Sequence, residues 1–447
     1  MTSFPLPRAV THRRVLAIAL PIVISNATVP ILGAVDTAVV GRIGTAAPIG
    51  AVGLGAVILA ALYAVLSFLR MGTTGLVAQE LGRGDAGAAA RHLARAVIIG
   101  LAAGAAVALL QPLLIAGGLS LSPASDEVEA LARQYLGLRL WGAPAAITLY
   151  ALTGYLIAAE RTRGVLALQL LMNGVNIALD LAFVPGFGWG VPGVAAATLI
   201  AEWAGLGLGL WLCRDALRLG LSAGWARIFD RARMARVLRV NGDIMIRSLL
   251  LQLGFLTFLF LGARAGDVTL AANQVLLQFL EITAYALDGF AFAAEALVGQ
   301  AVGARSRPLL RRAGVVTSLW GLAGALGLTV LFLGWGEALI ALMTTAPAVR
   351  AEAAAHLWWM GLLPVLSLAC WMLDGIYIGA TRTREMRNAM IVAIAGYFAL
   401  MPLLVGSFGS HGIWAALLAM NLMRGLTLAV LYPRLERAVV SGEAAAA

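Results

Sequence analysis

Residues 164–200 read GVLALQLLMNGVNIALDLAFVPGFGWGVPGVAAATLI, an apolar stretch that carries two strongly polar residues, Asn176 and Asp180. The two residues are four positions apart, which places both side chains on one face of a helix, about one turn apart. A carboxylate in the hydrocarbon core of a bilayer costs about 2.5 to 3.5 kcal/mol on insertion scales, and such residues usually face a protein interior or a water-filled path. The stretch therefore predicts a membrane helix with an ion or substrate site on one side.

The whole chain has the composition of a protein that crosses a membrane many times. It has 447 residues, of which 61% are hydrophobic and 12% are charged, and its mean hydropathy is +0.91. A helix needs about 20 apolar residues to cross a hydrocarbon core. Segments that meet this length lie at residues 13–40, 46–79, 91–117, 128–159, 164–184, 191–213, 236–262, 268–300, 309–334, 349–380, 386–406 and 411–432. The predicted fold class is an all-α polytopic membrane protein with twelve transmembrane helices.

The distribution of arginine predicts the orientation of the chain in the membrane. All 32 Lys and Arg residues are Arg, and 24 of them lie at the two ends of the chain or in the loops after every second predicted helix. The loops on the opposite side hold only Arg42, Arg264 and Arg350. By the positive-inside rule both termini are expected in the cytoplasm, with the chain in the inner membrane. The net charge of +10 is then a topology signal and a contact with anionic membrane lipid, and we expect no nucleic-acid partner.

An internal repeat divides the chain into halves. VAQELG at 77–82 matches VGQAVG at 298–303, and RTR at 161–163 matches RTR at 382–384, both at an offset of 221 residues. An even number of helices in each half means that both halves enter the membrane in the same direction. We therefore predict two six-helix bundles, residues 1–213 and 236–447, related by a pseudo-two-fold axis along the membrane normal. Residues 214–235 are predicted to be a cytoplasmic linker.

Four polar residues of the first half are predicted to lie close to one depth. Asp36, Asp180 and Thr198 each lie five or six residues from the outer end of their predicted helix. At a rise of 1.5 Å per residue, this is roughly 8 Å below that end, and Asn176 lies one turn deeper. Two carboxylates, an amide oxygen and a hydroxyl suit a small hard cation such as Na+, or a shared proton. The alternative is that the acids only hold helices together by hydrogen bonds.

The first predicted helix, residues 13–40, also carries two prolines, Pro21 and Pro30, each of which removes a backbone donor and can bend a helix. A bend close to Asp36 is a candidate moving part. Prolines that are simply tolerated by packing are the alternative.

The second half has polar residues of its own, whose role the sequence leaves open between substrate or proton contact and structural pairing. Asp243 and Arg247 are four residues apart, and we expect them to form an ion pair. Glu202, Arg70 and Arg424 are expected to be structural partners of buried acids or to reach the membrane interface. The candidate secondary polar sites are Asp243, Glu281, Asp288, Glu295 and Asp374.

Five short segments carry a combined signature: MNGVNIALD at 172–180, NGDI at 241–244, ANQV at 272–275, LDGFAF at 287–292 and GATRTR at 379–384. Together they resemble the multidrug and toxic compound extrusion (MATE) family, in particular its DinF-like branch. The resemblance covers essentially the whole chain. It implies a cation-coupled antiporter that exports organic, cationic or amphipathic compounds by alternating access of two six-helix lobes.

The resemblance also implies roles for particular residues. The family's cation site in the first lobe corresponds here to Asp36, Asn176, Asp180 and Thr198. In the NorM-like branch carboxylates of the second lobe carry the coupling, and Asp374 is the residue that corresponds to one of these, as a secondary candidate. The coupling ion is H+ or Na+, no other cofactor is expected, and the transporter is expected to act as a monomer on a small-molecule substrate.

Three other functions compete with export. A flippase for lipid-linked oligosaccharides or lipids of the same superfamily would share the lobes, but the arginines here lie mainly in loops and not in a central cavity. An enzyme is not expected, because His12, His92, His356 and His411 are scattered and no nucleophile constellation is present. A membrane scaffold or receptor would not need two acids at a matched depth. Cys213 and Cys370 are too few for a disulfide framework and are expected to be packing residues.

Overall fold

The computed structural model describes residues 9–41, 46–120 and 124–441, and every regular element in these ranges is helical. Arg42, which belonged to the predicted outer loops, lies outside the described residues. The elements are α1 (His12–Gly41), α2 (Ala46–Leu66), α3 (Phe68–Gly82), α4 (Ala86–Leu109), α5 (Gln111–Ser120), α6 (Asp126–Arg139), η1 (Leu140–Gly142), α7 (Ala143–Ala158), α8 (Thr162–Leu181), η2 (Ala182–Gly186), α9 (Gly190–Leu221), α10 (Trp225–Ile228), α11 (Arg231–Arg264), α12 (Asp267–Gly303), α13 (Arg307–Met343), α14 (Pro347–Leu366), α15 (Leu368–Gly379), α16 (Thr383–Phe408) and α17 (Ser410–Ser441).

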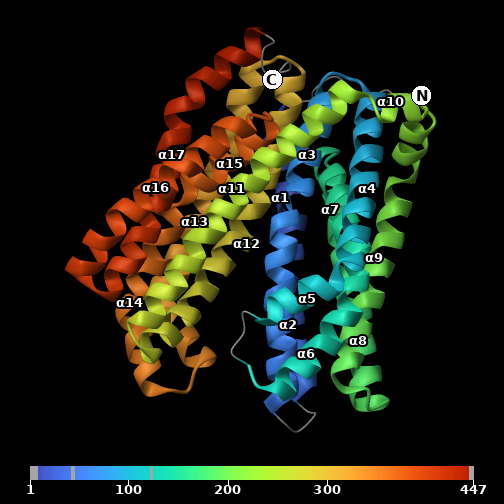
Figure 1. The fold of residues 1–447 in the computed structure, drawn as a ribbon. Coiled ribbons are helices and arrows are strands. Elements are labelled where there is room, and N and C mark those ends of the chain that lie inside the picture. Colours follow the sequence, from blue (N-terminus) through green and yellow to red (C-terminus); the bar gives the residue numbers. More distant parts are fainter. Residues whose placement is uncertain (1–8, 42–45, 121–123, 442–447) are drawn as a thin grey trace. The chain divides into compact units, whose positions relative to one another are not determined.

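The helices provide the twelve membrane spans that the sequence predicts. Within the described residues, 12 helical stretches are long and apolar enough to cross a bilayer (Figure 1). Three of these spans are interrupted, between α2 and α3, between α6 and α7, and between α14 and α15. The fourth span is interrupted close to Pro144, and the tenth close to Pro364. Proline favours such interruptions because it removes a backbone donor and clashes with the preceding turn.

The internal repeat is present in the backbone of the turns. Three pairs of residues at an offset of 221 all have positive φ: Gly84 (79°) and Arg305 (53°), Glu160 (57°) and Thr381 (52°), and Gly188 (71°) and Gly409 (57°). The hydrogen bonds around them repeat as well, since Asp85 N donates to Glu80 O and Ser306 N donates to Ala301 O, both at 3.0 Å. The left-handed region is unfavourable for most side chains, so the shared conformation reflects a shared turn structure and not chance.

The chain folds into two compact units. Unit 1 comprises Met1–Val23, Leu81–Gly84 and Leu238–Ala447, and unit 2 comprises Ile24–Glu80 and Asp85–Val237. The helix α1 passes from unit 1 into unit 2 between Val23 and Ile24. Much of the segment 214–235 is helical, because α9 continues to Leu221, α10 follows, and α11 begins at Arg231.

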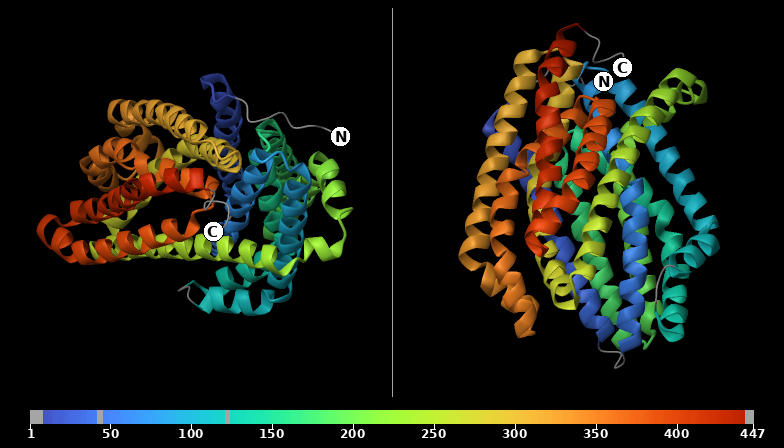
Figure 2. Two further views of the ribbon diagram at one scale, coloured as in Figure 1. Left: turned by 90° about the horizontal axis from the view of Figure 1, so that it is seen from above. Right: turned by 60° about the vertical axis from the view of Figure 1, so that its left-hand side comes forward.

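The core of unit 1 lies between the helices that follow Leu238, and it combines aliphatic residues with aromatic pairs. Phe258 packs edge-on against Trp414, with ring centroids 4.6 Å apart, and Phe279 packs against Phe332 at 4.9 Å. The indole nitrogen of Trp414 donates a hydrogen bond of 2.9 Å to Asn273 Oδ1, so its polar atom is satisfied inside the core. Around this core α13 runs beside α14 and α16 beside α17 (Figure 2).

Unit 2 places its core around the second half of α1. Buried residues of this core include Val39 on α1, Leu136 on α6 and Val194 on α9. In the same unit α4 packs closely against α7 at Gly104. A Cβ atom added to Gly104 would lie 2.6 Å from Pro144 N and 2.7 Å from Ala143 O, so the two helices approach each other backbone to backbone.

Replacing Gly104 by Ala should therefore weaken the fold of unit 2. The backbone of Ala143 and Pro144 cannot rotate away as a side chain would, and we expect a loss of about 1 to 3 kcal/mol of unfolding free energy. Thermal unfolding of the purified protein, followed by circular dichroism, measures the effect. Gly137→Ala is the matched control, because nothing lies within 4 Å of the added Cβ there. A melting temperature that falls equally for both variants would contradict the packing argument.

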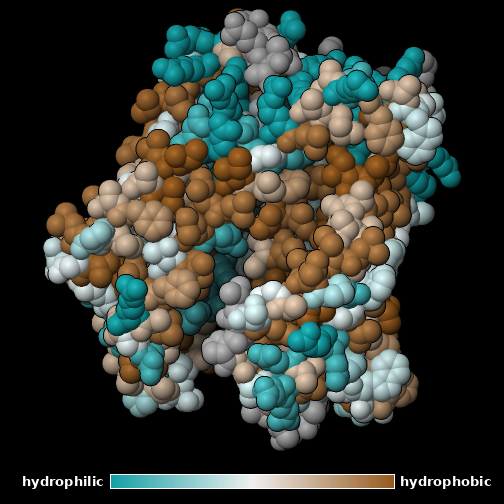
Figure 3. Space-filling view, in the orientation of Figure 1, coloured by the Kyte–Doolittle hydropathy of each residue, from teal (hydrophilic) through white to brown (hydrophobic). Residues whose placement is uncertain are grey.

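The surface of the units suits a bilayer. Many large apolar side chains are exposed on the helices, such as Val57 at 67%, Leu113 at 71% and Val430 at 77%. In the space-filling view hydrophobic residues cover much of the visible surface of the helices, and hydrophilic residues gather toward the helix ends (Figure 3). Lipid chains can cover exposed apolar side chains at no cost in solvation, and the chain is therefore a multi-pass membrane protein.

Candidate cation site

The two polar residues of the opening stretch are both buried on α8. Asp180 is fully buried and Asn176 is 1% exposed. Asn176 Nδ2 donates a hydrogen bond of 2.9 Å to Asp180 Oδ2, as their spacing of one turn allows. The helix ends one residue after Asp180 and continues as the π-helical turn η2, which contains Pro185. Such π-turns often accompany functional sites, because they change the direction of the backbone next to the site.

Thr198 reaches the same place from α9. Asn176 Nδ2 lies 3.3 Å from Thr198 Oγ1 and donates to it, and Thr198 Oγ1 itself donates to Val194 O at 3.1 Å. The hydroxyl hydrogen of Thr198 is therefore used within its own helix. Its oxygen is left as an acceptor that faces Asn176.

Asp36 completes the group from α1. Its side chain is half-buried, and its carboxyl group lies within hydrogen-bonding reach of the carboxyl group of Asp180. A hydrogen bond between two carboxyl groups requires a proton on one of them, because carboxylate oxygens only accept. The structure thus brings together the four residues that the depth argument selected, all within unit 2.

Several oxygens of this group have no hydrogen-bond partner. Oδ1 of Asp36, Oδ1 of Asn176 and Oδ1 of Asp180 are each buried and unsatisfied. Buried acceptors without a partner are costly and rare in native structures. A proton or a small cation placed among them would satisfy these oxygens, and oxygen ligands of this kind are the ones that hard cations prefer. The donor set therefore fits either ion.

A buried ion pair lies beside the site. Arg139, at the end of α6, contacts Glu202 on α9 through two N–O distances of 2.9 Å, and both side chains are about 8% exposed. Arg139 is also close enough to Asp36 for their charges to interact. The sequence predicts that Glu202 partners a buried acid or reaches the membrane interface, whereas in the structure it is buried and pairs with Arg139. An arginine inside a predicted span is the signal that identifies such a residue.

The acids of unit 1 pair differently from what the sequence predicts. Asp243 Oδ1 accepts from Arg387 Nη1 at 2.6 Å and its Oδ2 accepts from Thr383 Oγ1 at 3.1 Å. Arg247 binds Asp374 instead, so the predicted pair of Asp243 with Arg247 is wrong. Neighbouring helices supply closer partners than the same helix does, since α15 and α16 both present charged groups to α11.

Asp374 is held by two cations. It contacts Arg247, and Arg424 Nη2 lies 3.7 Å from its Oδ2. Arg424 also donates to Cys370 Sγ at 2.9 Å, and all these side chains are buried. These contacts favour structural pairing for Asp374 over direct contact with substrate.

Three acids on α12, spaced by seven residues and called here the α12 stripe, have different surroundings. Glu281 is exposed, Asp288 is half-buried and Glu295 is 1% exposed. They share one side of the helix, as their spacing of seven predicts, but they do not form one cluster with a common environment. The stripe stays a secondary candidate.

Two of the four histidines are neighbours in the fold, which their distance in sequence does not reveal. The rings of His356 and His411 stack with centroids 4.0 Å apart. His356 Nε2 lies 2.9 Å from Ser410 Oγ, and His411 Nδ1 accepts from Trp359 Nε1 at 3.1 Å. In the part of the chain that the structure describes, no group of three or more His, Cys, Asp or Glu residues is arranged to hold a metal ion.

Comparison with known proteins yields one family. The MatE family model matches the chain twice, over residues 21–182 and 244–405. The second match begins 223 residues after the first (244 minus 21), close to the repeat offset found in the turns.

Two relatives align with nearly the whole chain. DNA damage-inducible protein F of Escherichia coli (strain K12) is 42% identical over 426 residues, which cover 93% of this chain and 91% of that protein. The protein named "Probable multidrug resistance protein NorM" of Pseudomonas aeruginosa is 28% identical over 441 residues, covering 91% of this chain and 86% of its own.

A solved structure agrees in fold. A multidrug resistance MATE family transporter of the MOP superfamily, in an outward-facing conformation, matches with a TM-score of 0.88 and 18% identity. The match covers 98% of this chain and 99% of that one.

Proposed function

The chain belongs to the MatE family, whose members are transporters and not enzymes, and from this premise we propose that it is a cation-coupled antiporter. It exports organic compounds, cationic or amphipathic in character, by alternating access of its two halves. The coupling ion is H+ or Na+. The protein works as a monomer in the inner membrane, with both termini in the cytoplasm, as the arginine distribution predicts.

One observation carries the proposal. Three buried side-chain oxygens, on Asp36, Asn176 and Asp180, lack a hydrogen-bond partner in one small group that also contains Thr198. The donors of Asn176 Nδ2 are used by Asp180 and Thr198. A bound cation would therefore satisfy the three remaining acceptors. Two acids in reach of each other bind one proton far better than they tolerate two negative charges.

The cation can drive transport because it binds the two states of the protein with different strength. Facing outward, the carboxyl groups of Asp36 and Asp180 take a proton, or Na+ with oxygens of Asn176 and Thr198, and substrate leaves. After reorientation the cation is released to the cytoplasm and new substrate enters.

Helix α1 is placed to transmit this exchange. It carries Asp36 and Pro30, and it belongs to unit 1 up to Val23 and to unit 2 from Ile24. Asn173 Nδ2 on α8 donates to Thr28 Oγ1 at 2.8 Å, two residues before Pro30. A proline without its backbone donor offers little resistance to bending, so a change at Asp36 alters the bend of α1.

Transport in liposomes tests the proposal. The full chain is reconstituted into vesicles loaded with a fluorescent organic cation, and either acid or Na+ is imposed outside. We expect substrate release to accelerate under one of the two gradients relative to vesicles at equilibrium. If the rate of substrate release were unchanged by either gradient, the proposed cation coupling would be wrong. A flippase would instead move labelled lipid between leaflets in the same vesicles.

Thr198→Val separates the two ions within the same assay. Valine keeps the shape of threonine but removes the oxygen that faces Asn176. If Na+ is the coupling ion, the Na+ concentration needed for half-maximal release should rise by roughly tenfold, since each lost ligand weakens a hard-cation site. If a proton is the coupling ion, the dependence on acid should stay close to that of the unchanged protein.

A further inference from the structure

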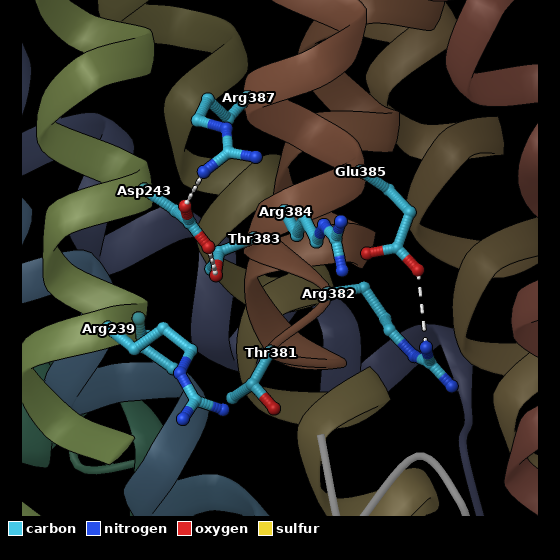
Figure 4. Close-up of a pocket in the computed structure, with 9 residues that line it drawn as sticks. Arg239, Asp243, Thr381, Arg382, Thr383, Arg384, Glu385 and Arg387 are labelled. Atoms are coloured by element: carbon cyan, nitrogen blue, oxygen red, sulfur yellow. Dashed lines mark hydrogen bonds and ion pairs between the residues drawn. The ribbon is translucent and has the colours of Figure 1, made fainter. Parts of the chain in front are cut away.

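Unit 1 contains a basic pocket near the start of α11 and the start of α16. It has a volume of about 510 Å³ (Figure 4). Its walls come from two helices that are far apart in sequence. The lining residues are Arg239, Val240 and Asp243 on α11 and Thr381, Arg382, Thr383, Arg384, Glu385 and Arg387 at the α15–α16 turn and the first turns of α16.

The charges of the pocket do not cancel. Asp243 is bound to Arg387 and Thr383, and Glu385 Oε1 is 3.2 Å from Arg382 Nη1. Each acid therefore neutralises one arginine. Among the described residues neither Arg239 nor Arg384 has an acidic partner, so the pocket keeps two positive charges.

The backbone of the pocket also favours an anion. Helix α16 begins in the pocket, and its N-cap residue Arg382 makes no side-chain capping hydrogen bond. At the start of α13, by contrast, Ser306 accepts from Leu309 N. Arg382 therefore supplies no side-chain acceptor to the first N–H groups of α16, and the positive end of the helix dipole adds to the charge of the arginines.

The internal repeat separates the charges that recur with the turn from those found in the second half alone. The turn residues Arg382, Thr383 and Arg384 recur in the first half as RTR at 161–163. At the same offset of 221 the other charged positions become apolar or glycine. Arg239 corresponds to Ile18, Asp243 to Ile22, Glu385 to Gly164 and Arg387 to Leu166. The pocket is thus a feature of the second half alone.

Each of the two unpartnered arginines lies at one end of an exposed apolar stripe, which is a row of apolar residues along one side of its own helix. At intervals of seven residues, which keep to one side of a helix, Arg239 is followed by Ile246, Leu253 and Phe260, which are 40%, 44% and 61% exposed. In the same way Arg384 is followed by Ile391 and Phe398, which are 45% and 38% exposed. A soluble anion would make no use of these stripes, whereas the acyl chains of a lipid would cover them.

We propose that this basic pocket binds the phosphate group of an anionic phospholipid, whose acyl chains lie along the two stripes. The guanidinium groups of Arg239 and Arg384 offer paired donors to phosphate oxygens. By the arginine distribution the pocket lies at the cytoplasmic leaflet, where basic pockets between helices are suited to anionic head groups.

Native mass spectrometry of the purified full chain tests the proposal. Phosphatidylglycerol and phosphatidylcholine are added separately to the unchanged protein and to the Arg239→Gln/Arg384→Gln double variant. We expect phosphatidylglycerol to bind the unchanged protein at least about tenfold more tightly than phosphatidylcholine, and the double variant to lose this preference. Both replaced side chains are exposed, so the variant should fold normally.

The matched control is Arg434→Gln/Arg437→Gln, which removes two exposed arginines near the end of α17 in the same unit. This variant should keep the preference for phosphatidylglycerol. An equal loss in both double variants would reduce the effect to net charge and overturn the proposal. Inorganic phosphate provides a further arm. If it binds the pocket as tightly as phosphatidylglycerol does, the assignment to a lipid is wrong.

Discussion

Asp180→Asn should reduce cation-driven export to the level of vesicles without protein. Asparagine has the size of aspartate and still offers an oxygen to Asn176 Nδ2, so the packing of α8 on α9 is preserved. It cannot carry a charge and cannot take up a proton. A cation that the variant binds in neither the outward-facing nor the inward-facing state cannot favour one state over the other. It therefore cannot drive the change between them.

Asp36→Asn should have the same effect, because the two carboxyl groups act as one site. Transport is measured in proteoliposomes under imposed pH and Na+ gradients, with expression and melting temperature recorded for each variant. Asp215→Asn is the matched control, since its side chain is 84% exposed and lies in the same unit. Undiminished transport by both Asp36→Asn and Asp180→Asn would refute the assignment of the cation site.

Glu202→Gln should strongly destabilise unit 2. It leaves the guanidinium of Arg139 buried without its paired carboxylate, next to a helix interruption where little can rearrange. Removing one partner of a buried ion pair costs about 3 to 5 kcal/mol. We expect a clear fall in the melting temperature of the purified protein in detergent.

Replacing both partners separates a charge effect from a packing effect. Arg139→Met/Glu202→Met removes both charges and keeps long unbranched side chains, and apolar replacement of a buried pair is often neutral. The double variant should therefore be more stable than Glu202→Gln alone. A double variant that is less stable than the single one would show that the carboxylate and guanidinium contribute through contacts other than their pairing.

Much of the fold follows from local properties of the sequence. The twelve spans were predictable because a bilayer requires long apolar helices, and this requirement acts on each segment separately. The repeat was predictable because matching turns need matching residues, as at 161–163 and 382–384. The bounds of the helices were less predictable. Helix α9 continues to Leu221, beyond the apolar stretch, because polar helical turns outside a membrane leave no signal in hydropathy.

The composition of the candidate site also followed from the sequence. The spacing of Asn176 and Asp180 and their depth relative to Asp36 and Thr198 are properties of single helices, and helix geometry converts them into positions.

Only the tertiary structure decided which charges meet. Arg139 binds Glu202, Asp243 binds Arg387 and Asp374 binds Arg247, and in each pair the two residues lie on different helices. Such partners depend on which helices are neighbours and how each is rotated about its axis. The hydropathy of one segment predicts neither the neighbours of a helix nor its rotation. Any buried arginine can pair with any buried acid that the packing brings within reach.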